Sequence, residues 1–257
     1  MIAADAHDKK VAWDSDVAHR RFLGVLGGMG PLASAHFMQR LTLLTDQKQD
    51  QDHIPALLWS DPRIPDRTDA RLKGGEDPLA ALVAGTRGLL DAGAKAIVIP
   101  CNSAHLWHDE LVEHTHAHVL HIVHAVLKQL KKAGVHEGRI GLLAATATVN
   151  LGLYQSVLEP AGYTCVQLQP SDQENICMRS IRHVKANELE APYPLAIQGA
   201  EQLQREGATA IVLGCTEFAI AIPDYYRASC AIPLIDSVDA LALAAIEWYF
   251  SSGDQNV

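Results

Sequence analysis

The sequence has no apolar run long enough to span a bilayer and no dense cluster of lysine and arginine. A transmembrane helix needs about 18 or more consecutive apolar residues, so we expect no membrane partner. We also expect no nucleic-acid partner, because the formal net charge is −9 and a polyanion requires a basic surface. An anionic small molecule would need a local cationic pocket.

The sequence also lacks the features of an exported, disulfide-bonded protein. Residues 1–21 are polar and contain no apolar region of a signal peptide, and we expect them to form an N-terminal extension. Five cysteines among 257 residues are an odd number, which fits reduced thiols in the cytoplasm better than a disulfide framework. With 48% hydrophobic residues, the chain can bury the core of one large domain or of two lobes.

What the chain does contain is an internal repeat. Residues 92–103 read AGAKAIVIPCNS and residues 206–217 read EGATAIVLGCTE, so that Cys101 aligns with Cys215. A short apolar run precedes each copy, FLGVLGG from Phe22 and RIGLLAA from Arg139. Such runs are typical of buried parallel strands. The repeat therefore indicates two copies of one structural unit, each with a thiol at the same place.

Strand and helix patterns alternate along both copies, which predicts an α/β fold with right-handed crossovers. We expect two similar lobes, each a parallel sheet flanked by helices, related by internal duplication, with the active site in the cleft between them. Lobe 1 is predicted to hold residues 22–125 plus about 237–257, and lobe 2 residues 126–236. Further strands are predicted at residues 54–59, 163–168 and 232–235, and helices from Pro31, after Asp77-Pro78 up to Gly93, over 194–206 and over 237–250.

The paired cysteines are the strongest candidates for chemistry. At the carboxyl ends of parallel strands, they would approach one ligand from opposite sides. A strand that turns into a helix N-terminus favours the thiolate, so we expect a lowered thiol pKa there. Two such groups suit the movement of a proton between the two faces of a carbon atom. The remaining cysteines have no such symmetry and are interpreted as structural: Cys165, Cys177 and Cys230.

Several other segments are candidates for ligand contact. The run Gly27-Gly-Met-Gly-Pro31 has neither the dinucleotide nor the P-loop spacing, but it suits a carboxylate or phosphate at the start of a helix. Arg67 and Lys185 are cations in otherwise ambiguous settings, and a surface arginine is the default interpretation of Arg67. A histidine-rich stretch covers residues 105–124 without zinc-ligand spacing, so we predict no metal site. His105, four residues after Cys101, is a candidate for the cleft.

Together, the motifs GGMGP (27–31), PCNSAH (100–105) and LGCTE (213–217) resemble the aspartate racemase branch of the aspartate/glutamate racemase superfamily over about residues 22–250. The resemblance implies a two-lobed α/β fold, racemisation without a cofactor and a homodimer. It also implies that Cys101 and Cys215 transfer the proton and that Arg67 and Lys185 bind the substrate carboxylates. The substrate-binding residues that it implies are Met29, Gly30, Arg67, Asn102, Ser103, Lys185, Thr216 and Glu217.

The sequence departs from the family pattern at two points. The family commonly has threonine where this chain has Ser103, which keeps the hydroxyl and loses a methyl group. The glutamate racemase branch usually carries an Asp-Ser motif in the first loop, where this chain reads GGMG. A dedicated glutamate racemase is therefore disfavoured, although glutamate stays open as a substrate.

The sequence is thus interpreted as an amino-acid racemase for aspartate, glutamate or both. One alternative is another enzyme on the same scaffold, namely a maleate-type isomerase, a hydantoin racemase or a decarboxylase. A second is a thiol-based redox sensor or an amino-acid-binding module. The sequence does not fix aspartate against glutamate, because one methylene contributes only about 1–3 kcal/mol of discrimination.

Overall fold

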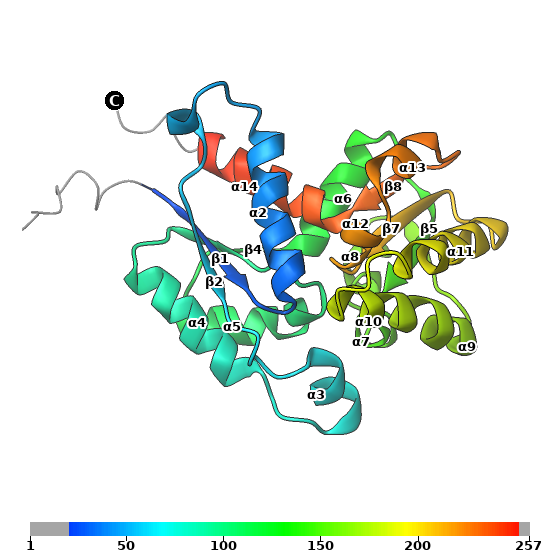
Figure 1. Cartoon of the computed structure of the whole chain (residues 1–257), viewed down its shortest axis with the longest axis horizontal. Coiled ribbons are helices and arrows are strands. Elements are labelled where there is room, and N and C mark those ends of the chain that lie inside the picture. The colour runs from blue at the N-terminus through cyan, green and yellow to red at the C-terminus, as the bar shows by residue number, and fades with distance from the viewer. Residues whose placement is uncertain (1–20, 252–257) are drawn as a thin grey trace, which may run out of the picture.

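The computed structural model describes residues 21–251 and contains two four-stranded parallel sheets (Figure 1). The strand order is β2-β1-β3-β4 in the first sheet and β6-β5-β7-β8 in the second. The same order occurs twice, with β3 and β7 as the equivalent strands that precede the two cysteines. The predicted α/β fold of two similar lobes is confirmed. The predicted N-terminal extension, apart from Arg21, lies outside the described residues.

The strands agree with the apolar segments of the sequence to within a few residues. The strand predicted at residues 163–168 ends earlier, at Val166, because Pro170 soon starts a helix. The final strand begins two residues later than predicted, at Leu234. The strands are β1 (Leu23–Gly27), β2 (Ala56–Ser60), β3 (Ala96–Val98), β4 (Val119–Leu120), β5 (Gly138–Ala144), β6 (Tyr163–Val166), β7 (Ala210–Gly214) and β8 (Leu234–Asp236).

The first half of the described chain contains six helical elements, of which α2 and α4 pack against the first sheet. Proline at the first position starts the 15-residue α2, as predicted, and α4 begins where Asp77 accepts a hydrogen bond from the backbone N–H of Leu79 at 2.9 Å. These helices are α2 (Pro31–Thr45), η1 (Asp50–Asp52), α3 (Arg67–Lys73), α4 (Leu79–Asp91), η2 (Ser103–Trp107) and α5 (His108–Thr115).

The second half repeats this arrangement and adds a long final helix. The helix predicted over residues 194–206 begins at Pro192, which again occupies a first helical position. The elements are α6 (Ile122–Lys132), α7 (Thr146–Asn150), α8 (Gln155–Leu158), α9 (Pro170–Asp172), η3 (Gln173–Met178), α10 (Arg179–Lys185), α11 (Pro192–Arg205), α12 (Phe218–Ala221), α13 (Asp224–Ser229) and α14 (Ser237–Ser251). Within residues 21–251, no helix is long and apolar enough to cross a membrane.

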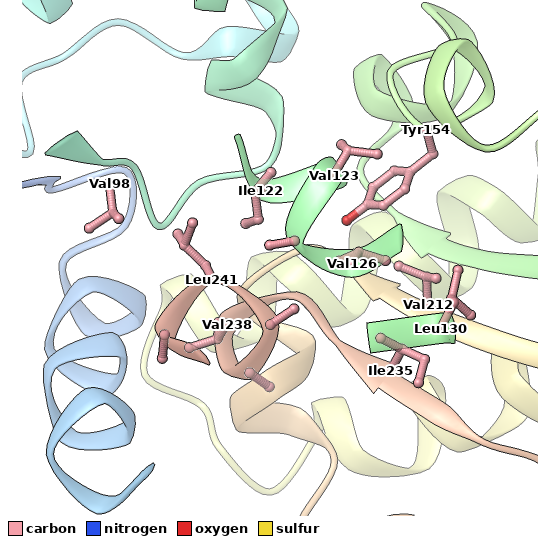
Figure 2. Close-up of a cluster of buried hydrophobic side chains, with 14 of the residues drawn as sticks. Val98, Ile122, Val123, Val126, Leu130, Tyr154, Val212, Ile235, Val238 and Leu241 are labelled. Atoms are coloured by element: carbon pink, nitrogen blue, oxygen red, sulfur yellow. The ribbon is translucent and has the colours of Figure 1, made fainter. Parts of the chain in front are cut away.

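Helix α14 joins the two halves. It packs against α2 on one side and α6 on the other, and in Figure 1 it runs, in red, from the second sheet back to the first. The residue 125/126 boundary predicted between the lobes falls inside α6. A single apolar cluster extends from Val98 of the first sheet to Val212 of the second, with Val126 and Leu241 of these helices between them (Figure 2). The shared core holds both sheets in one arrangement.

An ionic network also connects α2 to the second half. Arg40 of α2 makes two hydrogen bonds to the carboxylate of Asp239 in α14, at 2.6 and 2.8 Å. Arg227 of α13 contacts Asp236 at 2.5 Å. Bidentate arginine–carboxylate pairs fix geometry as well as contributing energy. The network therefore constrains α2, whose first turn borders the candidate site.

Candidate active site

The first thiol lies on the loop that follows β3. Two residues, Ile99 and Pro100, separate the strand from Cys101. The backbone N–H of Cys101 donates to the carbonyl of Ile99 at 2.7 Å, which turns the chain sharply. The Cys101 Sγ lies 3.6 Å from the hydroxyl oxygen of Ser103. The hydroxyl that the sequence places two residues after the cysteine thus contacts the thiol itself.

The second thiol follows β7 directly. The Cys215 thiol donates to Glu217 Oε2 at 2.9 Å, and the Thr216 hydroxyl donates to the same oxygen at 3.3 Å. Glu217 is buried, and its other oxygen, Oε1, has no hydrogen-bond partner among residues 21–251. This Oε1 is directed at the glycine run, 3.9 Å from the place where a Cβ on Gly30 would lie. The two thiols therefore have different polar contacts, a hydroxyl for Cys101 and a carboxylate for Cys215.

The two thiols line one cavity of about 250 Å³ between the halves of the molecule. Cys101 and Ser103 contribute from the first half, and Cys215, Thr216 and Glu217 from the second. Eight further residues of this wall were not predicted. They are Asp66, Thr68, Asp69 and Lys73 from the first half and Ala145, Met178, Ile181 and Arg182 from the second, Asp66 being the N-cap of α3.

The expectation of a lowered thiol pKa is wrong for Cys215. Burial and the carboxylate of Glu217 raise its pKa well above the ordinary value, and Cys101 adds to the effect while Lys185 opposes it. The helix that follows, α12, has only four residues, and any favourable effect of its positive end is outweighed by a buried negative charge in contact with the sulfur. Cys215 therefore rests as a thiol.

The predicted glycine run forms the wall beside α2. Gly28 has a φ of 96°, and a Cβ there would lie 2.3 Å from the carbonyl oxygen of Asp61, so only glycine fits. The N–H of Gly28 donates to the Ser34 hydroxyl at 2.9 Å, which in turn donates to the carbonyl of Gly30 at 2.8 Å. These contacts bring the first turn of α2 to the site, where its positive end favours an anion.

Arg67 is not the surface residue that its charged segment suggests. Its side chain is buried, and its guanidinium donates to the backbone carbonyls of Ile64 (3.1 Å), Pro65 (2.6 Å) and Met29 (3.2 Å). The Nε has no partner among residues 21–251. Arg67 is thus mainly occupied in holding the loop around Met29, with the Nε–H left to a ligand. The sequence could not reveal this, because one of the carbonyls that it binds, that of Met29, belongs to a separate loop 38 residues earlier.

Lys185 is the more accessible cation. It comes from the last turn of α10 and lies 3.7 Å from Asp66 across the cavity. Burial opposes its charge, but the negative charges around it, with Glu217 first, outweigh burial and raise the pKa of Lys185, so it stays protonated. A second cavity of about 390 Å³ adjoins the first, and both are lined by Met29, Asp66, Arg67, Lys185 and Glu217. Gly30 lines only this outer cavity.

Two predicted residues have other contacts. The Asn102 amide borders the cavity, but its Nδ2 donates to Ser237 and its Oδ1 accepts from Tyr154, at 2.9 and 2.6 Å. His105 does not line the cleft, because η2 carries its ring behind the loop, where Nδ1 contacts the carbonyl of Cys101 at 3.0 Å. Its Nε2 accepts from the N–H of Ile122 at 3.2 Å, so Nδ1 carries the proton and is the donor to Cys101.

The histidine-rich stretch folds into a cluster of rings. His105, His108, His121 and His124 contact one another with centroid separations of 4.6–6.3 Å. Burial lowers the pKa of His105 to about 4 and that of His121 to about 2. Within residues 21–251, no group of three or more His, Cys, Asp or Glu side chains is arranged to hold a metal ion. Of this cluster, the rings of His105 and His121 are therefore neutral at pH 7, and His105 packs beneath the Cys101 loop.

Comparisons with known proteins place this arrangement in a family. The profile of the Asp/Glu/hydantoin racemase family matches residues 26–245. The solved structure of Picrophilus torridus aspartate racemase is 33% identical, with a TM-score of 0.80, over 90% of this chain and 95% of that chain. A broad specificity amino-acid racemase, RacX of Bacillus subtilis, is 26% identical over 89% of this chain and 98% of its own length.

Glutamate racemases share the fold. The Francisella tularensis enzyme, solved in complex with D-glutamate, is 16% identical with a TM-score of 0.64, covering 92% of this chain and 84% of that chain. The family predicted from the three motifs is thus confirmed. The chain belongs to the Asp/Glu/hydantoin racemase family, in its aspartate racemase branch, and is an isomerase of the racemase type.

Proposed function

We propose that the protein interconverts L- and D-aspartate, L- and D-glutamate, or both, by two-cysteine proton transfer at Cα without a cofactor. The thiolate of one cysteine removes the Cα proton, and the thiol of the other protonates the opposite face of the resulting carbanion. Roles exchange for the other enantiomer. The observation that carries the proposal is the shared cavity, which Cys101 and Cys215 reach from opposite halves of the molecule.

The charges around this cavity suit an acidic amino acid. Lys185 and the free Nε–H of Arg67 supply positive charge to carboxylates, and the first turn of α2 adds backbone N–H groups in the adjoining cavity. Glu217 Oε1 and Asp66 are acceptors for an ammonium group. Cations fixed near the α-carboxylate offset the negative charge that develops on proton removal. The name of the Picrophilus relative favours aspartate.

The carboxylate beside Cys215 gives that thiol a distinct role. Because Cys215 rests protonated, it serves first as the acid, and Cys101 serves as the base. After one turnover the proton is on Cys101 and Cys215 is the thiolate. Glu217 Oε2, at 2.9 Å, then offers a route by which Cys215 exchanges its proton.

The test is a chiral-chromatography assay of the purified protein with both enantiomers of aspartate and glutamate, without pyridoxal phosphate. Incubation in deuterium oxide shows incorporation at Cα. We expect racemisation of at least one pair, with loss in Cys101→Ala and in Cys215→Ala. Each single variant retains one thiol, so the two variants should exchange the Cα proton of opposite enantiomers without inverting them, and Cys101→Ala should exchange more slowly because Cys215 rests protonated.

Cys165→Ala is the matched control, since it removes a half-buried thiol of the second half that does not line the cavity. Racemisation that survives in the double variant Cys101→Ala, Cys215→Ala would remove the two-thiol mechanism. Absence of exchange with all four amino acids would point to the isomerase, hydantoin racemase or decarboxylase alternative.

A further inference from the structure

A buried chain of hydrogen bonds connects the two thiol-bearing loops. Asn102, next to Cys101, donates through Nδ2 to the Ser237 hydroxyl at 2.9 Å. Ser237 donates to the carbonyl of Leu213 at 2.7 Å, two residues before Cys215. The Ser237 hydroxyl has one proton, so this donation leaves its lone pair to accept from Asn102. The loops are therefore joined by two directed bonds across the boundary between the sheets.

Tyr154 contacts both loops at once. Its hydroxyl donates to Asn102 Oδ1 at 2.6 Å. Its ring lies against Gly214, where an added Cβ would be 2.9 Å from Tyr154 Cε2. Gly214 directly precedes Cys215, so one side chain spans from the residue after Cys101 to the residue before Cys215. In Figure 2 the Tyr154 side chain projects into the apolar cluster that the two sheets share.

The environment keeps this arrangement in one state. Tyr154 and Ser237 have no exposed surface, and Asn102 is 2% exposed. Burial raises the pKa of Tyr154, so the phenol keeps the proton that it donates. Both ends of the Asn102 amide are used, and turning the amide over would set its oxygen against the lone pair of Ser237, whose one proton is donated to Leu213. Buried polar groups with every partner satisfied specify a single geometry.

We propose that Tyr154, together with Asn102 and Ser237, sets the spacing between the two thiols, as positioning residues of the racemase. The inference rests on the proposed two-cysteine mechanism, in which both sulfurs must reach one Cα from opposite faces. The two loops belong to different sheets, so a small movement between the halves lengthens one transfer or both. A misplacement of about 1 Å can reduce a rate about 100-fold.

The test compares Tyr154→Phe with Tyr163→Phe. Tyr163 is a buried tyrosine of the same half, and its hydroxyl donates to the carbonyl of Val135 at 2.8 Å, away from the cavity. Both substitutions remove one hydroxyl and one hydrogen bond. We expect similar decreases in melting temperature. For Tyr154→Phe alone we expect kcat to fall about 10- to 100-fold, with KM changed less than about twofold, because the groups that bind the substrate are intact.

The Cα-deuterium isotope effect on kcat is the second measurement. Slower proton transfer makes that step more rate-limiting, so the isotope effect should rise in Tyr154→Phe and stay at the wild-type value in Tyr163→Phe. Ser237→Ala breaks the other arm of the chain and should lower kcat in the same way. If Tyr154→Phe does not fold, Ser237→Ala decides the question.

The outcomes separate this inference from the proposed function. Equal kcat and isotope effects for Tyr154→Phe and Tyr163→Phe, in a wild type whose racemisation needs both cysteines, overturn the positioning role alone. A wild type without racemisation, or one that is active without the cysteines, overturns both. A fall in kcat with a raised isotope effect, confined to Tyr154→Phe and Ser237→Ala, supports the inference.

Discussion

Gly214→Ala places a methyl group between the Tyr154 ring and the strand that carries Cys215. The new Cβ would lie 2.9 Å from Tyr154 Cε2 and 3.1 Å from the Cβ of Ala144. Carbon atoms in contact are about 3.5–4.0 Å apart, so the ring or the strand must move by roughly 0.6 Å or more. Overpacking of this kind destabilises by about 1–3 kcal/mol, which lowers the melting temperature by about 2–12 °C in a protein of this size.

The effect on activity should exceed the effect on stability. Cys215 is the next residue, and a displacement of more than half an ångström should lower kcat at least about tenfold. Gly141→Ala is the control, because Gly141 lies on the neighbouring strand β5 with comparably close contacts, 3.0 Å to Leu203 Cβ and 3.2 Å to Ala208 Cβ. Its pairing with Ile211 puts it three residues, about 10 Å, from the end of the strand.

The two variants are compared by thermal unfolding and by racemisation followed with circular dichroism. We expect similar losses of stability and a loss of kcat in Gly214→Ala only. If Gly214→Ala retains wild-type kcat while it is destabilised, the reasoning that this contact sets the position of Cys215 is refuted. If Gly141→Ala loses kcat equally, the effect is a general consequence of overpacking.

Three further outcomes are expected. Glu217→Gln removes a charge that helps to raise the pKa of Cys215, so alkylation of Cys215 by iodoacetamide at pH 8 should accelerate relative to alkylation of Cys101. Peptide mass spectrometry measures the ratio of the two alkylation rates, and an unchanged ratio would contradict this role of Glu217. His105 and His121 resist protonation when folded, with pKa values of about 4 and 2, whereas the unfolded chain takes up these protons near pH 6.5. The unfolded state then binds more protons, so stability should fall as the pH drops below about 6.5, by up to about 1.4 kcal/mol per pH unit for each histidine. The variant His121→Asn keeps a capping residue for α6 and should show a shallower dependence of stability on pH in unfolding titrations. An unchanged slope would count against burial as the cause. Asp77→Ala removes the acceptor for the Leu79 N–H and for the buried Trp107 indole. The free energy of unfolding should decrease by about 1–3 kcal/mol and the melting temperature by about 2–12 °C, with kcat unchanged. A fall in kcat would place Asp77 closer to the site than its contacts indicate.

Most of the fold that the sequence predicts follows from the internal repeat. Matching AIV segments at Cys101 and Cys215 predicted two equivalent strands, and both cysteines follow the third strand of sheets with the same order. Helix starts at Pro31 and after Asp77 followed from local chemistry, because a proline or a capping carboxylate acts within one turn. Ends of strands were less accurate, since pairing with a neighbour decides them.

The site was predicted where a residue acts through its position on a strand, and missed where it acts through distant partners. Both cysteines reach the cavity, whereas the raised pKa of Cys215 depends on how deeply Glu217 is buried against it. Arg67 is read as a surface cation until the three carbonyls around it are in place. Tyr154 has no motif, and its contacts with Asn102 and Gly214 join residues that are distant in sequence.

The different contacts of the two sulfur atoms, with Ser103 and with Glu217, affect the kinetic constants that the proposed enzyme would show for the two enantiomers. Enantiomers have equal free energies in water, so the ratio of the two second-order rate constants is fixed at unity by thermodynamics. The carboxylate beside Cys215 nevertheless makes one protonation form of the free protein more abundant than the other. The two antipodes should therefore saturate the protein at different concentrations and turn over at different maximal velocities, although neither accumulates at equilibrium.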